Sequence, residues 1–204
     1  MTNKEDKIKY VVFRIIEDSP EHSVFFLSDF AEITSLETIR KVLSQACEAK
    51  MLTRIAHGIY AKPMMSRFGE VPVPLEKVAL AIAERDHSLI MPSGNTAANI
   101  LGLSTQVPMV VSYITTGSSR TINIGNRSLQ FRHAAPRNFA YKGSSVPLIV
   151  QAFKELGEEN IGERELSKIS EFLSAAKDRD VLSSDILLAP MWVRNRLNGL
   201  IKAS

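Results

Sequence analysis

The sequence predicts an α+β protein with two domains, and three patterns indicate this fold class. Apolar residues recur at helical spacing near the start of the chain and again near its end. Between them, short segments of alternating polar and apolar residues are separated by turn residues, which is typical of a small antiparallel sheet. A stretch with three prolines and one glycine at 61–74 indicates a connection between modules. We expect a winged helix-turn-helix domain at 1–70 and a C-terminal α+β domain with a small antiparallel sheet and helices at 71–204.

The composition indicates a soluble, cytoplasmic protein. The chain has 204 residues, 45% of them hydrophobic, which suits one large or two small cores. It begins with charged residues rather than with the regions of a signal peptide, and no apolar run approaches the roughly 20 residues that span a bilayer. The single cysteine, Cys47, rules out an internal disulfide and a cysteine-based zinc site. We expect its side chain to pack as a small hydrophobic group.

The first helix is predicted at 4–17 from five apolar residues at helical spacing. These are Ile8, Val11, Val12, Ile15 and Ile16. After a break at 19–23, the stretch VFFLSDFAEI predicts a short strand or extended segment, then a helix of one to two turns with Ser28 as its N-cap.

A longer helix, SLETIRKVLSQACEAKM, is predicted to begin at Ser35 and Thr38 after a turn at 34–35. Its apolar face is expected to consist of Leu36, Ile39, Leu43, Ala46 and Cys47. The following segment, MLTRIAHGIYAKP, alternates on both sides of the turn residues His57 and Gly58 and predicts a small hairpin. Helix, short helix, turn, longer helix and two-stranded wing is the order of a winged helix-turn-helix.

This order places a set of polar side chains where such a module meets DNA. The helix would contact base edges in the major groove, and the wing would contact phosphates or the minor groove. The candidates are Ser35, Thr38, Lys41, Ser44 and Gln45 on the helix, and Arg54, His57 and Lys62 on the wing. Winged-helix modules also dock proteins, and residues 1–70 contain equal numbers of basic and acidic side chains, so this alternative stays open. Glu37 and Glu48 on the same helix face favour it.

In the second domain, a helix is predicted at 74–86, and three alternating segments follow: MVVSYITTG, SRTINIG and RSLQFRHA. Helices are predicted from SVPLIVQAFKELG, RELSKISEFLSAA and MWVRNRLNGLIK. No Asp or Glu occurs between His87 and Lys154, so a surface built from this segment would attract phosphate. We expect a second basic surface that supplements the winged helix. Its members would be Arg120, Arg127, Arg132, Arg137 and Lys142.

The stretch MPSGNTAANILGLSTQVP at 91–108 has the small residues of a functional loop but none of the required chemistry. It has neither the glycines of a nucleophile elbow nor the Gly-Lys-Ser/Thr ending of a phosphate-binding loop. His87 and His133 are the nearby histidines, and we expect both to be solvated or structural. Ser93 or Asn95 is predicted to cap a helix that ends at Gly102 and packs closely against the sheet. We predict no catalytic residue, no bound metal and no cofactor, and hence no enzyme.

Several stretches in this order resemble the AbiEi-type antitoxins of type IV toxin–antitoxin systems. They are GIYAKP (58–63), FGEVPVP (68–74), PSGNTAANILGLSTQVP (92–108), YITTGSSRTINIG (113–125) and LQFRHAAPRN (129–138). The resemblance implies an N-terminal module that binds inverted repeats in its own promoter and represses the operon. It implies a C-terminal domain that neutralises a cognate nucleotidyltransferase-like toxin, without requiring a stable complex. It also implies a monomer that binds the repeats on double-stranded DNA cooperatively.

Other functions stay open alongside the autoregulatory antitoxin. A winged-helix regulator could instead sense a small ligand, which would require a pocket with convergent polar groups, or dock a protein without acting as an antitoxin. The sequence also leaves open whether the last helix packs inward or presents Arg194 and Arg196 to a partner.

Overall fold

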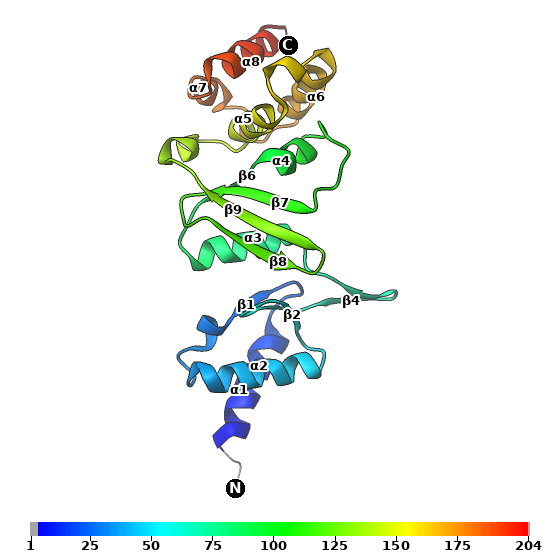
Figure 1. The fold of residues 1–204 in the computed structure, drawn as a ribbon, viewed down its shortest axis with the longest axis vertical. Coiled ribbons are helices and arrows are strands. Elements are labelled where there is room, and N and C mark those ends of the chain that lie inside the picture. The colour runs from blue at the N-terminus through cyan, green and yellow to red at the C-terminus, as the bar shows by residue number, and fades with distance from the viewer. Residues whose placement is uncertain (1–3, 204) are drawn as a thin grey trace. The chain divides into compact units, whose positions relative to one another are not determined.

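The computed structural model describes residues 4–203, which fold into two compact units, Met1–Ile82 and Ala83–Ser204. Figure 1 shows helices combined with small sheets, so the α+β class is confirmed. The division falls within α3 (Leu75–Arg85) rather than at residue 70. None of the described helices has the length and apolar character needed to cross a membrane.

The described part of the first unit consists of two α-helices, a 3-10 helix, a three-stranded sheet, a separate hairpin and most of α3. Its elements are α1 (Lys4–Asp18), β1 (Val24–Phe26), the 3-10 helix η1 (Leu27–Phe30), α2 (Leu36–Glu48), β2 (Thr53–Ala56), β3 (Ile59–Ala61), β4 (Met64–Ser66) and β5 (Gly69–Val71). The three-stranded sheet has the order β1-β3-β2, and both of its pairings are antiparallel. The predicted hairpin at 53–61 is confirmed, with Gly58 at φ +70° in its turn.

The core of this unit forms where α1 and α2 pack with the sheet. Val12 and Ile16 of α1 are fully buried, as are Ile39 and Leu43 of α2. The apolar faces predicted for α1 and α2 include residues that are in fact exposed. The exposed members are Val11 and Ile15 on α1 and Leu36 at the start of α2, and Val42 takes a core position on α2 that was not predicted. Leu36 is exposed because it lies at the helix end, one turn before the buried stripe begins.

The prediction for Ser28 is wrong, because η1 already begins at Leu27 and Ser28 lies inside it. The Asp29 carboxylate accepts a hydrogen bond from the backbone N–H of Phe26 at 2.8 Å, which stabilises the start of this short helix. The N-cap prediction for α2 is confirmed, since the Ser35 hydroxyl accepts a hydrogen bond from the Thr38 backbone N–H at 3.4 Å.

The second unit consists of a four-stranded sheet and a group of helices. Its elements are β6 (Ile90–Pro92), α4 (Gly94–Ile100), β7 (Val110–Thr115), β8 (Arg120–Ile124), β9 (Arg127–His133), the 3-10 helices η2 (Pro136–Phe139) and η3 (Glu158–Asn160), α5 (Ser145–Leu156), α6 (Glu163–Ser174), α7 (Leu182–Ile186) and α8 (Met191–Ala203). The three predicted C-terminal helices are confirmed as α5, α6 and α8. The short α7 and β6 were not predicted.

The sheet is mixed, so the prediction of a purely antiparallel sheet in this domain is wrong. Its order is β6-β7-β9-β8, and β7 pairs with β9 in parallel. The turn residues after β7 do not form a hairpin, because they cross the end of β9 before β8 begins. His133 fixes this crossing: its backbone N–H donates to the Ser119 hydroxyl at 2.8 Å, and its Nδ1 lies 3.0 Å from the Gly117 carbonyl oxygen. Of the two roles expected for His133, solvated or structural, these hydrogen bonds support the structural one.

The PSGNTAANILGLSTQVP stretch forms a structural layer of this unit. Ala97 and Ala98 of α4, and Leu101 directly after it, are buried in one core with α5. The Thr96 hydroxyl accepts a hydrogen bond from the Ser112 backbone N–H of β7 at 2.8 Å. Figure 1 shows α4 between β7 and α5. Ser93 occupies the N-cap position, but its side chain makes no capping hydrogen bond. The small residues therefore let α4 lie close to a helix as well as to the sheet.

Candidate nucleic-acid interface

The outer face of α2 presents polar side chains to solvent, but not all of them are free. The hydroxyls of Ser35 and Thr38 lie 3.0 Å apart and belong to the helix cap. Lys41 Nζ lies 3.5 Å from a carboxylate oxygen of Glu37, in a pair that is mostly exposed and hence weak. Ser44 and Gln45 are exposed, and neither side chain has a hydrogen-bond partner among the described residues. The second half of α2 is therefore the part most available to a ligand.

A recess of about 250 Å³ joins this half of α2 to the β2–β3 hairpin. Its polar lining includes Arg40 and Ser44 from the helix and Arg54 and His57 from the hairpin. An Arg54 guanidinium nitrogen lies 3.4 Å from His57 Nδ1, which holds the two wing candidates together. The structure thus brings three of the predicted candidates, Ser44, Arg54 and His57, to one place.

Arg40 is the member of this recess that the sequence reading missed. It is exposed and lies one helical turn before Ser44, so both side chains face the hairpin. The spacing of four residues was a signal that could have identified it. With Arg40 included, two guanidinium groups line the recess, which makes it locally positive although the module as a whole is neutral.

Cys47 also lines this recess and is half-buried. Burial raises the pKa of its thiol, and the nearby positive charge of Arg54 only partly offsets this effect. The thiol therefore stays protonated at neutral pH, consistent with the packing role expected from the sequence.

Lys62 does not belong to this surface. Its Nζ donates hydrogen bonds to the backbone carbonyls of Glu17 at 2.7 Å and Ser19 at 2.6 Å. These carbonyls lie at the C-terminal end of α1, where a positive charge is favoured by the helix dipole. The wing role predicted for Lys62 is therefore not supported, because its ammonium group already ties the sheet to α1.

The five residues of the expected second basic surface do not share one face. Side chains alternate along a strand, and Arg127 and Arg132 are an odd number of positions apart on β9. The register places Arg120 opposite Phe131 and Arg127 opposite Ile124, so these two arginines lie on the face with Leu129 and Phe131. Arg132 lies on the other face. The prediction of one continuous surface is wrong for this geometric reason.

Arg120 and Arg127 are also engaged within the unit. The Arg120 guanidinium pairs with the Asp86 carboxylate and lies 5.3 Å above the Phe131 ring. Burial acts to raise the pKa of Asp86, but the hydrogen bonds and charges of Arg85 and Arg120 outweigh it and hold the pKa below its ordinary value. Arg127 donates a hydrogen bond to the Pro108 carbonyl at 3.3 Å. Both arginines therefore serve the fold of this unit.

Arg132, Arg137 and Lys142 are exposed and make no ion pair with another described residue. Arg137 lies close enough to Lys154 to affect it: burial is the main cause that lowers the pKa of Lys154, and the Arg137 charge adds to this lowering. Three of the five residues of the expected set are thus available, fewer than the sequence suggested.

Arg132 lines a hollow of about 550 Å³ at the start of α4. Its polar lining also includes Asn95, Gln130 and Glu155. An ideal Cβ on Gly94 would lie 3.1 Å from Glu155 Oε2 and 3.6 Å from Arg132 Nη2, so both charged groups approach the backbone of the PSGN stretch. Gly94 has φ +57°, a conformation that favours glycine. The hollow therefore presents the positive charge of Arg132 and the negative charge of Glu155 beside the turn at Gly94.

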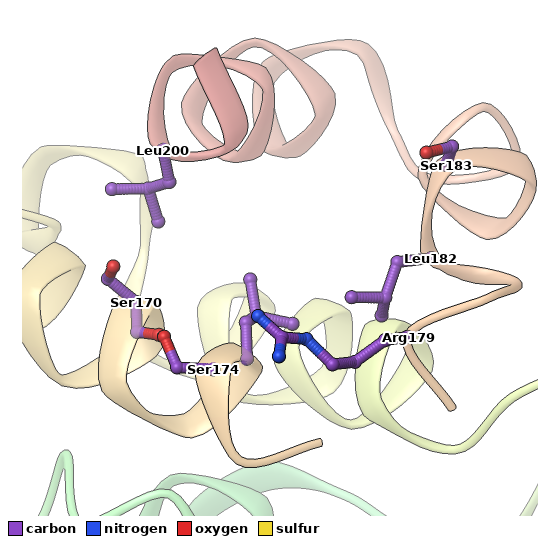
Figure 2. Close-up of a pocket in the computed structure, with 7 residues that line it drawn as sticks. Ser170, Ser174, Arg179, Leu182, Ser183 and Leu200 are labelled. Carbon is purple, nitrogen blue, oxygen red and sulfur yellow. The ribbon is translucent and has the colours of Figure 1, made fainter. Parts of the chain in front are cut away.

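A smaller cavity of about 190 Å³ lies among α6, α7 and α8 (Figure 2). Ser170, Ser174, Ser183 and Arg179 supply its polar lining, and Figure 2 shows the Arg179 guanidinium reaching across the opening toward Ser174. Leu173, Leu182 and Leu200 supply the apolar part.

Arg194 and Arg196 on the last helix have different environments. The Arg194 guanidinium donates to the Leu187 carbonyl and, at 3.4 Å, to the Ala189 carbonyl. Arg196 is exposed. Only Arg196 therefore remains available to a partner. No three His, Cys, Asp or Glu side chains within residues 4–203 gather where they could hold a metal ion, and His87 is exposed.

Comparison with known protein families identifies a match over most of the chain. The model of a family of unknown function, DUF6088, matches residues 11–181, which is most of the chain and includes parts of both units. The chain therefore belongs to this family. No curated protein matches the chain.

Proposed function

We propose that this member of the DUF6088 family is a DNA-binding transcriptional repressor that acts on inverted repeats of its own promoter and serves as the antitoxin of a type IV toxin–antitoxin system. The first unit would be a winged helix-turn-helix, with α2 as the recognition helix and the β2–β3 hairpin as the wing. The antitoxin role is supported by the resemblance of several stretches to AbiEi-type proteins. The DNA-binding role is supported by that resemblance and by the surface of α2.

The observation that supports DNA binding best is the recess between α2 and the hairpin. Arg40 and Arg54 lie on its two walls, and Ser44 is exposed beside them. A helix in the major groove can use serine and glutamine side chains on base edges, while guanidinium groups on either side bind phosphates. In this proposal Lys41, Ser44 and Gln45 face the bases, and Arg40, Arg54 and His57 contact the backbone. Ser35 and Thr38 act mainly by capping α2, whose N-terminus then faces a phosphate.

A binding experiment tests this half of the proposal. The probe is a labelled duplex from the region directly upstream of the chain's own reading frame, with a scrambled duplex as the reference. We expect Lys41→Ala combined with Arg54→Ala to weaken binding by about tenfold or more, and Arg40→Ala to lower the slope of log K against log salt by about 0.9. The control is Arg14→Ala, which removes an exposed arginine of α1 that pairs with Asp18. Equal affinity of the wild type and the double variant would refute the assignment of α2 and the wing.

The antitoxin half concerns the neighbouring gene. We expect this gene to encode a nucleotidyltransferase-like protein that stops growth when expressed alone and is harmless when this chain is co-expressed. Neutralisation need not involve a stable complex, so the readout is growth rather than co-purification. A neighbour without toxicity, or toxicity that persists with this chain present, would refute this half while leaving DNA binding intact.

The second unit would add a smaller electrostatic contribution than the sequence suggested. Arg132, Arg137 and Lys142 are the exposed members of the expected set, whereas Arg120 and Arg127 are engaged. We therefore expect Arg137→Ala with Lys142→Ala to lower the salt slope on the upstream duplex, and Arg127→Ala to leave it unchanged. An unchanged slope in the first variant would confine the DNA contact to the first unit. A monomer that binds the repeats cooperatively would give a binding curve steeper than that of a single site.

A ligand-sensing regulator is the second candidate, because the hollow at the start of α4 offers convergent polar groups. Arg132 and Glu155 present opposite charges beside Asn95 and Gln130, which suits a small polar molecule with both an anionic and a cationic group. A thermal-shift screen of amino acids and small zwitterions against the wild type and Arg132→Ala tests it. A stabilising compound whose effect is lost in Arg132→Ala and that changes operator affinity would favour this candidate.

A further inference from the structure

A second hairpin occurs where the sequence indicated a connection between modules. β4 and β5 pair antiparallel, with Met64 opposite Val71, Met65 opposite Glu70 and Ser66 opposite Gly69. Only Arg67 and Phe68 remain to form the turn. Figure 1 shows this hairpin extending away from the three-stranded sheet of the first unit. The hairpin is distinct from the β2–β3 wing.

The tip of this hairpin is held in a fixed shape. The Ser66 hydroxyl donates a hydrogen bond to the Gly69 carbonyl at 2.9 Å and accepts one from the Phe68 backbone N–H at 3.2 Å. Gly69 has φ +114°, which closes the tight turn without the strain that a side chain would cause. The tip therefore presents Arg67 and Phe68 in a defined arrangement, at little additional cost in conformational entropy on binding.

Phe68 is 87% exposed, and the Arg67 guanidinium lies 4.6 Å from the centre of its ring. Arg67 lies over the ring, and most of the ring is still open to solvent. An exposed phenyl ring beside a guanidinium group combines the two contacts that nucleic acids offer, a stacking surface and a phosphate or groove edge. Phenylalanine at such a position is a known kind of wedge between base steps, and arginine is suited to the narrow minor groove.

The one acidic side chain of the hairpin is withdrawn from the tip. The Glu70 carboxylate accepts a hydrogen bond from the Thr53 hydroxyl at 2.6 Å. This bond also fixes the hairpin to β2, whose next residue, Arg54, lines the recess beside α2. The hairpin is thus anchored to the same strand as the proposed wing, and its free end has a positive charge.

We infer that the Arg67–Phe68 tip is a minor-groove contact, in which Phe68 stacks against base pairs and Arg67 binds in the groove or at its phosphate edge. The inference rests on the proposed function, because it requires double-stranded DNA as the ligand of the first unit. It adds a contact that neither α2 nor the β2–β3 hairpin supplies. α2 would occupy the major groove, and the minor groove is the one that a narrow two-residue tip can enter.

The experiment measures binding of the full chain to the labelled upstream duplex by fluorescence anisotropy. We expect Phe68→Ala to weaken binding by about tenfold, the loss typical of one aromatic–base contact. Arg67→Ala should lower the salt slope by about 0.9. Met65→Ala is the matched control, since Met65 lies on the same hairpin and is 67% exposed but is not part of the tip. It should leave affinity within about twofold, and melting temperatures should show that all three variants fold.

Base analogues identify the groove. Replacing adenine by 2,6-diaminopurine places an amino group in the minor groove, whereas an inosine–cytosine pair changes the major groove and keeps the minor-groove pattern of an A·T pair. Diaminopurine is substituted at one position of the duplex at a time. At the contacted positions it should weaken binding by the wild type and have little effect on binding by Phe68→Ala. Inosine–cytosine at the same positions should leave both proteins unchanged.

The outcomes separate this inference from the proposal beneath it. If the wild type binds the upstream duplex no better than the scrambled one, the repressor function fails and the tip contact fails with it. If the wild type binds specifically and Phe68→Ala binds equally well, only the tip contact is overturned. Normal DNA binding by Phe68→Ala with loss of toxin neutralisation would also overturn it, and would assign the tip to a protein partner.

Discussion

Asp178 caps α5 through Ser145: its carboxylate accepts hydrogen bonds from the Ser145 hydroxyl at 2.6 Å and from the Ser145 backbone N–H at 2.9 Å. A third hydrogen bond comes from the Ser144 backbone N–H at 2.7 Å. Asp185 holds the preceding residues in the same way, accepting from the backbone of Lys142 at 3.0 Å and of Gly143 at 2.7 Å. Two acidic residues from the end of the chain thus fix the start of the helix against which α4 packs.

Asp178→Ala should destabilise the protein by about 1–3 kcal/mol, because three donors at the start of α5 lose their partner together. Urea unfolding followed by circular dichroism measures this change. Asp180→Ala removes an exposed carboxylate in the same loop and should change the free energy of unfolding by less than about 0.5 kcal/mol. Equal effects of the two substitutions would show that the cap contributes nothing specific.

The same cap should make the protein sensitive to acid. Partial burial acts to raise the pKa of Asp178, but the hydrogen bonds from Ser145 and Ser144 prevail and hold the pKa below its ordinary value of 3.8. A pKa lowered by folding gives stability that is complete above the unfolded-state value and is lost as the pH falls through the folded-state value. We expect the urea midpoint of the wild type to fall below about pH 4 more steeply than that of Asp178→Ala. Parallel curves for the two proteins would contradict this.

Gly143→Ala should destabilise the protein through the same carboxylate. An added Cβ would overlap Asp178 Oδ2 and lie 2.9 Å from Asp178 Cγ, and this side chain is held by its hydrogen bonds. A loss of about 1–3 kcal/mol is expected in urea unfolding, whereas Gly199→Ala, which meets nothing within 4 Å on α8, should be neutral or stabilising. In an Asp178→Ala background, Gly143→Ala should have a smaller further effect, because Oδ2 and Cγ are gone and only the Cβ of residue 178, at 3.1 Å, remains close to the added group. If the stability losses of Gly143→Ala and Asp178→Ala were simply additive, the strain at Gly143 would not come from Asp178.

Lys62→Met should lower stability without changing operator affinity. The substitution keeps most of the aliphatic stem but removes the hydrogen bonds to the carbonyls of Glu17 and Ser19, which costs about 1–2 kcal/mol. Arg54→Ala should show the opposite pattern, with weaker DNA binding and little change in unfolding. If Lys62→Met is fully folded under the assay conditions and still binds DNA more weakly, Lys62 belongs to the DNA interface after all.

The sequence predicted the elements that depend on local signals. The buried face of α2 follows from the spacing of Ile39, Leu43 and Ala46, and the β2–β3 turn follows from the residues His57 and Gly58. The same helical spacing also predicted one residue of the recess, Ser44. It did not predict Arg40, because the polar face assigned to α2 did not include this neighbouring position.

The remaining features depend on contacts between distant residues, which local patterns do not specify. Turn residues after β7 show that the strand ends, but not that the chain then crosses β9. Nothing near Arg120 in the sequence indicates Asp86, and nothing near Lys62 indicates the end of α1. The sequence predicts a connection where the β4–β5 hairpin lies, because strands of three residues flanked by prolines give no clear strand pattern.

The position of β9 between β7 and β8 has a consequence for synthesis on the ribosome. β7 and β8 both emerge before β9, so the edges of β7 and β8 that pair with β9 stay open until His133 has left the exit tunnel. A nascent chain that stalls or is cleaved before this point has exposed strand edges, which promote aggregation. Release of residue 133 is therefore the earliest moment at which this sheet can close.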